Sequence, residues 1–191
     1  MRIPPPEHNT RASPLRTPYP YPHSQTAAWS GKGLYVNNGN GYWAPRMPEI
    51  FTWNLGSDAG GGLWNFSRYV PDAVLINLGT NDYSTPYAQQ PGFGANYTAA
   101  YVQFLTNLTA AWYPPTTPIF VVVGPMTTDY LAAAQAAVTT ARGAGINATL
   151  INVYGAMACP TCTGCAGHPS ATGYTAVFNA VQPVVASVLG W

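Results

Sequence analysis

The fold is decided by one stretch of the chain, Ala73-Val74-Leu75-Ile76-Asn77-Leu78-Gly79-Thr80-Asn81-Asp82. An apolar run that ends in a glycine, two small polar residues and an acid is typical of a buried strand that leads into an active-site loop. In open α/β sheets, ligands bind outside the carboxyl ends of the strands. An amide side chain at that position, here Asn81, can point its NH2 group at a developing oxyanion. Asp82 is interpreted as a structural acid of the loop.

Strands and helices are expected to alternate on both sides of this stretch. Apolar runs bounded by glycine or proline predict strands at 26–29, 73–78, 119–123 and 148–153. Apolar residues at helical spacing predict helices at 97–112 and 130–144, and a last helix that Ser170 caps and Pro183 bends. The stretch 34–68 has no clear period and is predicted to be a long structured loop with one helical turn near residues 47–50.

Continuous apolar strands separated by helices predict an α/β fold of three layers, in which helices flank a parallel sheet on both faces. A chain of 191 residues suits a single domain, which we place at residues 25–191. Residues 1–24 are rich in proline and are predicted to be an extended or disordered tail.

The composition excludes several classes of function. Only 7% of the residues are charged and the formal net charge is +1, which argues against nucleic acid and anionic membrane surfaces as partners, since both favour clustered Lys and Arg. No run is long and apolar enough to span a membrane. A hydrophobic fraction of 47% argues against disorder across the whole chain.

The compartment is expected to be extracellular or secretory. N-x-Ser/Thr sequons begin at Asn65, Asn96, Asn107 and Asn147, which favours a glycoprotein, although a chain rich in Thr and Asn also generates sequons by chance. Residues 1–22 contain seven prolines and no apolar core, so they are not a signal peptide. Either the protein is not exported, or its true N-terminus is missing from this sequence.

Three cysteines lie close together at Cys159, Cys162 and Cys165, and His168 follows three residues later. These four side chains could close around a metal ion. The alternative is one local disulfide with one free thiol, or three thiols in a loop. The metal site is the less favoured interpretation because His168 has another use.

Three short motifs are expected on the same edge of the sheet. Gly31 follows the strand predicted at 26–29, Asn81 follows the next strand, and His168 precedes the last helix. A glycine N–H and an asparagine amide are two donors for an oxyanion hole. A histidine at a helix start is a candidate general base for a hydroxyl nucleophile.

The motifs make the sequence resemble the SGNH (GDSL-type) hydrolase family, named for blocks that contribute Ser, Gly, Asn and His. Trp29-Ser30-Gly31 matches the glycine block, Gly79-Thr80-Asn81-Asp82 the asparagine block and His168-Pro169-Ser170 the histidine block. The segment 66–84 is similar to the carbohydrate esterase family two branch, whose members remove acetyl groups from plant polysaccharides. The resemblance implies a flavodoxin-like fold, a polysaccharide or small-molecule ester as substrate, and no metal or organic cofactor.

The chain departs from this family in two ways. The family opens with a strand that ends in Gly-Asp-Ser, whose serine is the nucleophile, and this chain has none. The acid that usually lies three residues before the histidine is replaced by Cys165. In the esterase branch a backbone carbonyl can orient the histidine instead, so the second loss is tolerable, but losing a triad nucleophile costs on the order of a millionfold in turnover.

The missing first strand also has a structural consequence. In the family it lies in the middle of the sheet, between the strands that lead to the glycine and asparagine blocks, so its absence leaves two strand edges open. We therefore expect the chain alone to be poorly folded, or its tail to fill the gap imperfectly.

Three functions are compatible with these residues. The first is a monomeric ester hydrolase that deacetylates carbohydrate, with His168 as base, Gly31 and Asn81 as oxyanion donors, and a nucleophile from outside the chain. The second is an inactive carbohydrate-binding remnant of the same fold, and the third is a small Cys/His metal-binding module. Among the aromatic residues, Trp64 and Tyr83 are the candidates for stacking on a sugar, with core packing as the alternative.

Overall fold

Three parallel strands form the central sheet of the protein, whose computed structural model describes residues 24–39, 41–42 and 45–191. The sheet order is β3 (Val74–Ile76), β4 (Ile119–Val123) and β5 (Ala148–Asn152). Both pairings are parallel. The sheet confirms the predicted α/β fold and its strands at 73–78, 119–123 and 148–153.

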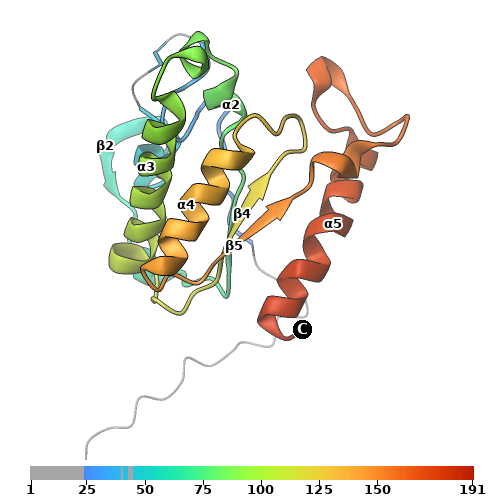
Figure 1. Cartoon of the computed structure of the whole chain (residues 1–191). Coiled ribbons are helices and arrows are strands. Elements are labelled where there is room, and N and C mark those ends of the chain that lie inside the picture. Colours follow the sequence, from blue (N-terminus) through green and yellow to red (C-terminus); the bar gives the residue numbers. More distant parts are fainter. Residues whose placement is uncertain (1–23, 40, 43–44) are drawn as a thin grey trace, which may run out of the picture.

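Helices cover both faces of this sheet, because parallel strands need crossover connections that pass over a face. α3 (Phe93–Asn107) and α4 (Leu131–Gly143) pack together on one face, and α5 (Ala171–Leu189) lies on the other (Figure 1). The helix predicted at 97–112 begins four residues earlier and ends in a π-helical turn, Leu108–Trp112.

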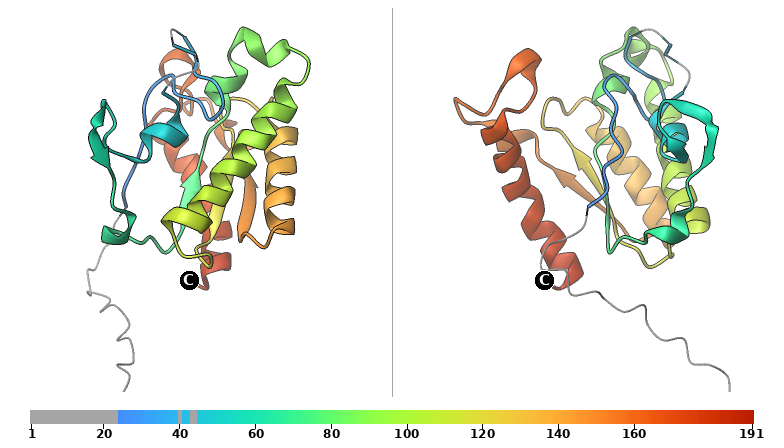
Figure 2. Two further views of the ribbon diagram at one scale, coloured as in Figure 1. Left: turned by 90° about the vertical axis from the view of Figure 1, so that its left-hand side faces the viewer. Right: turned by 180° about the vertical axis from the view of Figure 1, so that it is seen from behind.

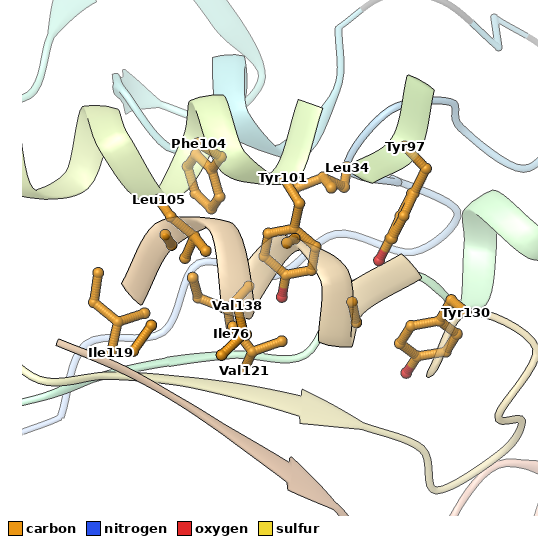
Figure 3. Packing of buried hydrophobic residues seen from close by; sticks show 14 of the residues in the cluster. Leu34, Ile76, Tyr97, Tyr101, Phe104, Leu105, Ile119, Val121, Tyr130 and Val138 are labelled. Atoms are coloured by element: carbon orange, nitrogen blue, oxygen red, sulfur yellow. The ribbon is translucent and has the colours of Figure 1, made fainter. Parts of the chain in front are cut away.

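The larger hydrophobic core lies between the sheet and the pair α3 and α4. Every second residue of β4 points into it, beginning with Ile119 and Val121, and Ile76 of β3 does the same. Figure 3 shows these strand residues below Leu105 of α3 and Val138 of α4. The opposite side of β4 presents its remaining residues to α5, in a smaller core made of Phe120, Val122, Ile151, Val153 and Val181.

The stretch 34–68 contains more regular structure than its sequence predicts. The predicted helical turn is present as α1 (Met47–Ile50). An antiparallel hairpin of β1 (Trp53–Leu55) and β2 (Asp58–Leu63) follows it. The hairpin was missed because three glycines in β2 remove the alternating apolar pattern that marks a strand.

The strand predicted at 26–29 does not form. Residues 24–29 are exposed and have no regular secondary structure. A strand needs a neighbour to bond to, and the sheet of the described residues ends at β3. The tail predicted at 1–24 lies outside the described residues except for Ser24. Within the described part, none of the helices combines the length and the apolarity needed to cross a lipid bilayer.

Candidate active site

One helical turn, α2 (Thr80–Tyr83), follows β3 and carries the predicted asparagine. The preceding residue, Gly79, has a φ of 137°, which a residue with a Cβ rarely adopts. A Cβ at this position would also lie 2.4 Å from the ring of Tyr130. The Gly-Thr-Asn-Asp sequence therefore turns sharply here because only glycine fits at its first position.

Asn81 connects the asparagine block to the glycine block. Its side-chain nitrogen donates a hydrogen bond of 2.9 Å to the carbonyl oxygen of Lys32, the residue after Gly31. An amide NH2 group carries two hydrogens, so this bond uses one and leaves the other for a ligand. The structure thus brings together the two residues that the sequence predicts as oxyanion donors.

Gly31 occupies a tight turn at the start of the loop 31–38. Its φ is 75°, and its carbonyl oxygen accepts a hydrogen bond of 2.8 Å from the backbone of Asn38. A Cβ on Gly31 would approach the carbonyl oxygen of Asn38 to 3.1 Å. The turn therefore favours glycine for steric reasons, and the donation of its N–H to an oxyanion remains a prediction.

Asp82 supports the same loop from inside the protein. Its carboxylate is fully buried and accepts hydrogen bonds from the backbone N–H groups of Leu34 at 3.0 Å, Tyr35 at 2.7 Å and Val36 at 2.9 Å. Burial raises the pKa of Asp82, and the three N–H donors oppose that rise. These contacts agree with the interpretation of Asp82 as a structural acid.

His168 lies in the exposed loop between β5 and α5. Its Nδ1 is 3.3 Å from the carbonyl oxygen of Cys165, and its backbone N–H donates to the same oxygen at 3.0 Å. With the hydrogen on Nδ1 donated to this carbonyl, Nε2 carries the lone pair that accepts a proton. A backbone carbonyl thus stands where most of the family has a carboxylate, as the resemblance to the esterase branch implies.

The histidine loop is attached to the start of α5. Ser170 caps the helix, because its hydroxyl oxygen accepts the N–H of Gly173 at 3.1 Å. The backbone N–H of Ser170 donates to the carbonyl oxygen of Cys162 at 2.8 Å. The backbone N–H of Gly164 donates to the carbonyl oxygen of His168 at 2.7 Å. These bonds fix the segment 162–170 against α5, and the predicted cap at Ser170 is confirmed.

The three cysteines divide into a pair and a single thiol. Cys159 and Cys162 form a disulfide, and Cys165 is free and exposed. Among the described residues, no group of three or more His, Cys, Asp or Glu side chains gathers closely enough to hold a metal ion. Of the alternatives that the sequence left open, the structure has the local disulfide with one free thiol.

We expect peptide mapping of the unreduced protein to find Cys159 linked to Cys162. Cys165 should take up iodoacetamide, because an exposed thiol is alkylated whereas a disulfide is not. Trypsin releases all three cysteines in one peptide, residues 143–191, so tandem mass spectrometry of that peptide locates the alkylated residue, and a reduced sample that takes up three alkyl groups is the control. Stoichiometric zinc with no alkylation of the native protein would contradict the pairing.

All three blocks lie at the same end of the sheet. The strands of Figure 1 point toward the end that carries α2, and the loop between β5 and α5 leaves the sheet there as well. α2 and the histidine loop stand on two sides of this end, next to the carboxyl ends of the strands. This is where ligands bind in open parallel sheets.

The two predicted sugar-stacking residues occupy different surroundings. Tyr83 is half-buried, and its ring packs edge-on against Phe93 and Tyr97. This placement supports core packing for Tyr83. Trp64 follows β2 and lines a groove along β3. Stacking on a sugar stays a prediction for both residues.

Sequence reasoning missed Asn77, a further residue that supports the site. Its side-chain nitrogen donates to the carbonyl oxygens of Val122 at 2.9 Å and Gly124 at 2.8 Å. These bonds tie the end of β3 to the end of β4, directly below α2. The available signal was a polar residue inside the otherwise apolar run 73–78.

This arrangement is an α/β domain with a candidate site at the carboxyl edge of a parallel sheet. The protein-family model described as GDSL-like Lipase/Acylhydrolase matches residues 38–181 of this chain. The chain belongs to this family. The SGNH resemblance found in the motifs is therefore confirmed.

Two curated relatives are carbohydrate-active. The chain is 39% identical over 99 residues to "Cellulase/esterase CelE" of Acetivibrio thermocellus, covering 52% of this chain and 11% of that protein. It is 29% identical over 85 residues to "Acetylxylan esterase / glucomannan deacetylase" of Cellvibrio japonicus, covering 44% of this chain and 22% of that protein. The chain thus spans a small part of each relative.

Solved structures of family two carbohydrate esterases have the same fold. The enzyme from Corynascus thermopiles (Myceliophthora fergusii) superimposes with a TM-score of 0.71 and 31% identity, over 85% of this chain and 51% of that one. The enzyme from Clostridium thermocellum in complex with cellohexaose gives a TM-score of 0.70 and 29% identity, over 85% and 49% of the two chains. Both confirm the predicted branch, and this chain spans about half of each.

Proposed function

We propose that this domain removes acetyl groups from carbohydrate by serine acyl transfer. The observation that carries the proposal is the hydrogen bond from Asn81 to the carbonyl of Lys32, because it holds the asparagine block against the residue that follows Gly31 in the glycine block. The relatives named as carbohydrate esterases support acetylated polysaccharide as the substrate class. The substrate is a neutral glycan ester, in keeping with a chain that has few charges.

The residues would divide the reaction between them. A serine hydroxyl oxygen attacks the acetyl carbon while its proton passes to Nε2 of His168. The electron pair of the carbonyl bond moves onto oxygen, which the N–H of Gly31 and the amide of Asn81 stabilise. When the carbonyl reforms, the sugar oxygen leaves and takes the proton from His168. Water then hydrolyses the acetyl-serine by the same steps and regenerates the hydroxyl.

The nucleophilic serine of this scheme comes from outside residues 1–191. The chain contains no Gly-Asp-Ser sequence. Asn81 and His168 each have a backbone hydrogen-bond partner, which supports the roles proposed for them. The chain therefore supplies the base and the oxyanion donors to a serine held on a separate strand.

Hydrolysis of 4-nitrophenyl acetate tests this function. The full chain is assayed alone and with a synthetic peptide that carries the Gly-Asp-Ser strand of a family two carbohydrate esterase. We expect turnover only with the peptide, and we expect His168→Ala to remove it. Asn179→Ala, an exposed change elsewhere on α5, should leave it intact. Turnover that persists in His168→Ala would show that the hydrolysis does not use this site.

The absence of a Gly-Asp-Ser sequence favours a second candidate, a carbohydrate-binding domain without turnover. This alternative keeps the candidate site as a binding surface and has no hydrolytic activity. Isothermal titration with cellohexaose and with acetylated glucomannan measures it. Binding of either glycan by a protein that shows no hydrolysis, with or without the peptide, would support the binding domain over the esterase.

We also propose that the protein works as a monomer in an extracellular or secretory compartment. The Cys159–Cys162 disulfide supports an oxidising environment. The sequon asparagines Asn65, Asn96 and Asn147 are exposed, so an oligosaccharide could be attached without unfolding the domain.

A further inference from the structure

The peptide group that joins Lys32 to Gly33 is hydrogen-bonded at both of its ends. Its carbonyl oxygen, on Lys32, accepts the bond of 2.9 Å from Asn81. Its N–H, on Gly33, donates a bond of 3.1 Å to Oδ1 of Asn37. This peptide bond is trans, since the cis bond found among the described residues precedes Pro125, so its C=O and N–H point in opposite directions in one plane. The two asparagines therefore contact the same rigid unit from opposite sides.

The side chain of Asn37 is itself held in a fixed orientation. It is only 2% exposed, and its nitrogen donates to the carbonyl oxygens of Gly41 at 2.9 Å and Pro45 at 3.0 Å. A side-chain amide has two hydrogens, so these two bonds use both and determine where its oxygen points. Contacts with residues 41 and 45 thus direct Oδ1 of Asn37 at the N–H of Gly33.

Gly33 depends on such support because it has no side chain of its own to pack. Glycine has the widest backbone freedom of any residue. A larger residue does not fit, since a Cβ at this position would lie 1.9 Å from the carbonyl oxygen of Val36 and 2.8 Å from Oδ2 of Asp82. Gly33 is instead anchored through its backbone, by the bond to Asn37 and by its carbonyl oxygen, which accepts the N–H of Met47 at 2.9 Å.

The other contacts of the loop 31–38 lie on either side of this peptide group. Asp82 accepts the N–H groups of residues 34–36, and the N–H of Asn38 closes the loop onto the carbonyl oxygen of Gly31. The loop lies at the end of the sheet that carries α2 (Figure 2). Neither contact reaches the N–H of Gly33, so the orientation of the peptide group 32–33 depends on Asn37 and Asn81 together.

Loss of the acceptor on Asn37 would therefore be felt at Asn81. Gly33 is buried, and a buried N–H group without a partner is strongly disfavoured. The peptide group would rotate to bring this N–H to another acceptor. Because C=O and N–H belong to one plane, the same rotation moves the carbonyl oxygen of Lys32 away from Asn81.

We propose that Asn37 is a positioning residue for the two oxyanion donors. It sets the orientation of the peptide group 32–33, and this peptide group in turn holds the amide of Asn81 next to the turn at Gly31. This inference rests on the proposed function for one point only, that these two donors stabilise an oxyanion. The coupling between Asn37 and Asn81 is a property of the folded chain and does not depend on the reaction.

Nuclear magnetic resonance of the ¹⁵N-labelled full chain tests the coupling. In Asn37→Ala we expect the N–H of Gly33 to exchange with solvent at least about tenfold faster, since its hydrogen bond is lost. We also expect the side-chain NH2 resonances of Asn81 to shift, because its bond to Lys32 is lost in the same rotation. Unchanged resonances of Asn81 would overturn the proposal.

Two control variants separate this effect from a general loss of stability. Asn54→Ala removes the same amide from the exposed hairpin, where Asn54 donates to the carbonyl oxygen of Gly61 at 3.0 Å. Ile151→Ala removes buried atoms from the smaller core, on the other face of the sheet from Leu34 of the loop, and lowers stability for that reason. We expect neither to shift the resonances of Asn81. A shift in Ile151→Ala as large as that in Asn37→Ala would overturn the proposal.

The native chain provides a measurement that needs no variant, which decides the question if Asn37→Ala does not fold. Scalar couplings across hydrogen bonds are expected between the nitrogen of Gly33 and Cγ of Asn37, and between Nδ2 of Asn81 and the carbonyl carbon of Lys32. Absence of either coupling would overturn the proposal.

Hydrolysis of 4-nitrophenyl acetate, with the serine peptide described above, tests the consequence for the reaction. We expect Asn37→Ala to lower kcat at least about tenfold and to leave KM within about twofold, because oxyanion donors act mainly in the transition state. Asn54→Ala should change neither. An unchanged kcat in Asn37→Ala would overturn the positioning role. If the native chain with the peptide shows no hydrolysis, the proposed function is rejected, and the resonances of Asn81 in Asn37→Ala decide the coupling by themselves.

Discussion

Replacing Asp82 by alanine is expected to lower the free energy of unfolding by at least about 3 kcal/mol, because three backbone N–H groups lose their acceptor and each unsatisfied buried donor costs about 1–3 kcal/mol. The donors belong to Leu34, Tyr35 and Val36, of which the first and third are buried. Urea denaturation followed by tryptophan fluorescence measures the loss.

The variant Asp82→Asn has nearly the same side-chain volume as the native residue, so it tests the contribution of the hydrogen bonds to stability separately from the loss of side-chain atoms. Oδ1 accepts the N–H groups of Tyr35 and Val36, and Oδ2 accepts that of Leu34. An asparagine keeps one oxygen, so it preserves two of these bonds and places an NH2 group against Leu34. We expect it to lose about half as much stability as the alanine variant. If both variants lost the same free energy of unfolding, the three hydrogen bonds from residues 34–36 would not be the way in which Asp82 stabilises the protein.

Replacing Gly173 by alanine is expected to destabilise the protein by about 3 kcal/mol, the upper range for forcing an extra methyl group into a packed site. A Cβ on Gly173 would lie 2.1 Å from the carbonyl oxygen of Cys162. The start of α5 would have to separate from the loop that holds His168. The hydrogen bond from Ser170 to the same carbonyl would be lost as well. Thermal unfolding measures the change.

Gly143→Ala is the matched control for this variant. Gly143 is also a helical glycine, in the last turn of α4, but no atom lies within 4 Å of a Cβ built on it. Alanine is favoured over glycine in a helix by about 0.5–1 kcal/mol, so this variant should be unchanged or slightly more stable. Limited proteolysis provides a local measurement, since only Gly173→Ala should expose residues 159–170 to cleavage. Equal stability of the two alanine variants would contradict the close contact at Cys162.

The sequence predicted the centre of the fold well because the buried strands carry their own signal. The run Ile119–Val123 is apolar at every position and is buried on both faces. The last helix was predicted from its apolar spacing and from Ser170, and both features are local. Signals of this kind need no knowledge of the rest of the structure.

Features that depend on distant neighbours could not be predicted in the same way. Residues 26–29 have the composition of a strand, but none of the strands in the described part of the chain lies beside them to accept their hydrogen bonds. The ring of Tyr83 packs against Phe93 and Tyr97 only after α3 has docked. Nothing in the sequence near Asp82 indicates that its carboxylate gathers three N–H groups from residues 34–36, which lie more than 40 positions away.

The candidate site is anchored at two places that share no hydrogen bond among those described above. Asn81 and Asp82 of α2 hold the loop that contains Lys32 and Leu34, while the Cys159–Cys162 loop and Ser170 hold His168 at the start of α5. Segments that separate sets of hydrogen bonds hold in place can open locally with different free energies. We therefore expect the loop that holds His168 and the turn that holds Asn81 to open with different free energies, which amide hydrogen exchange of the two segments would measure.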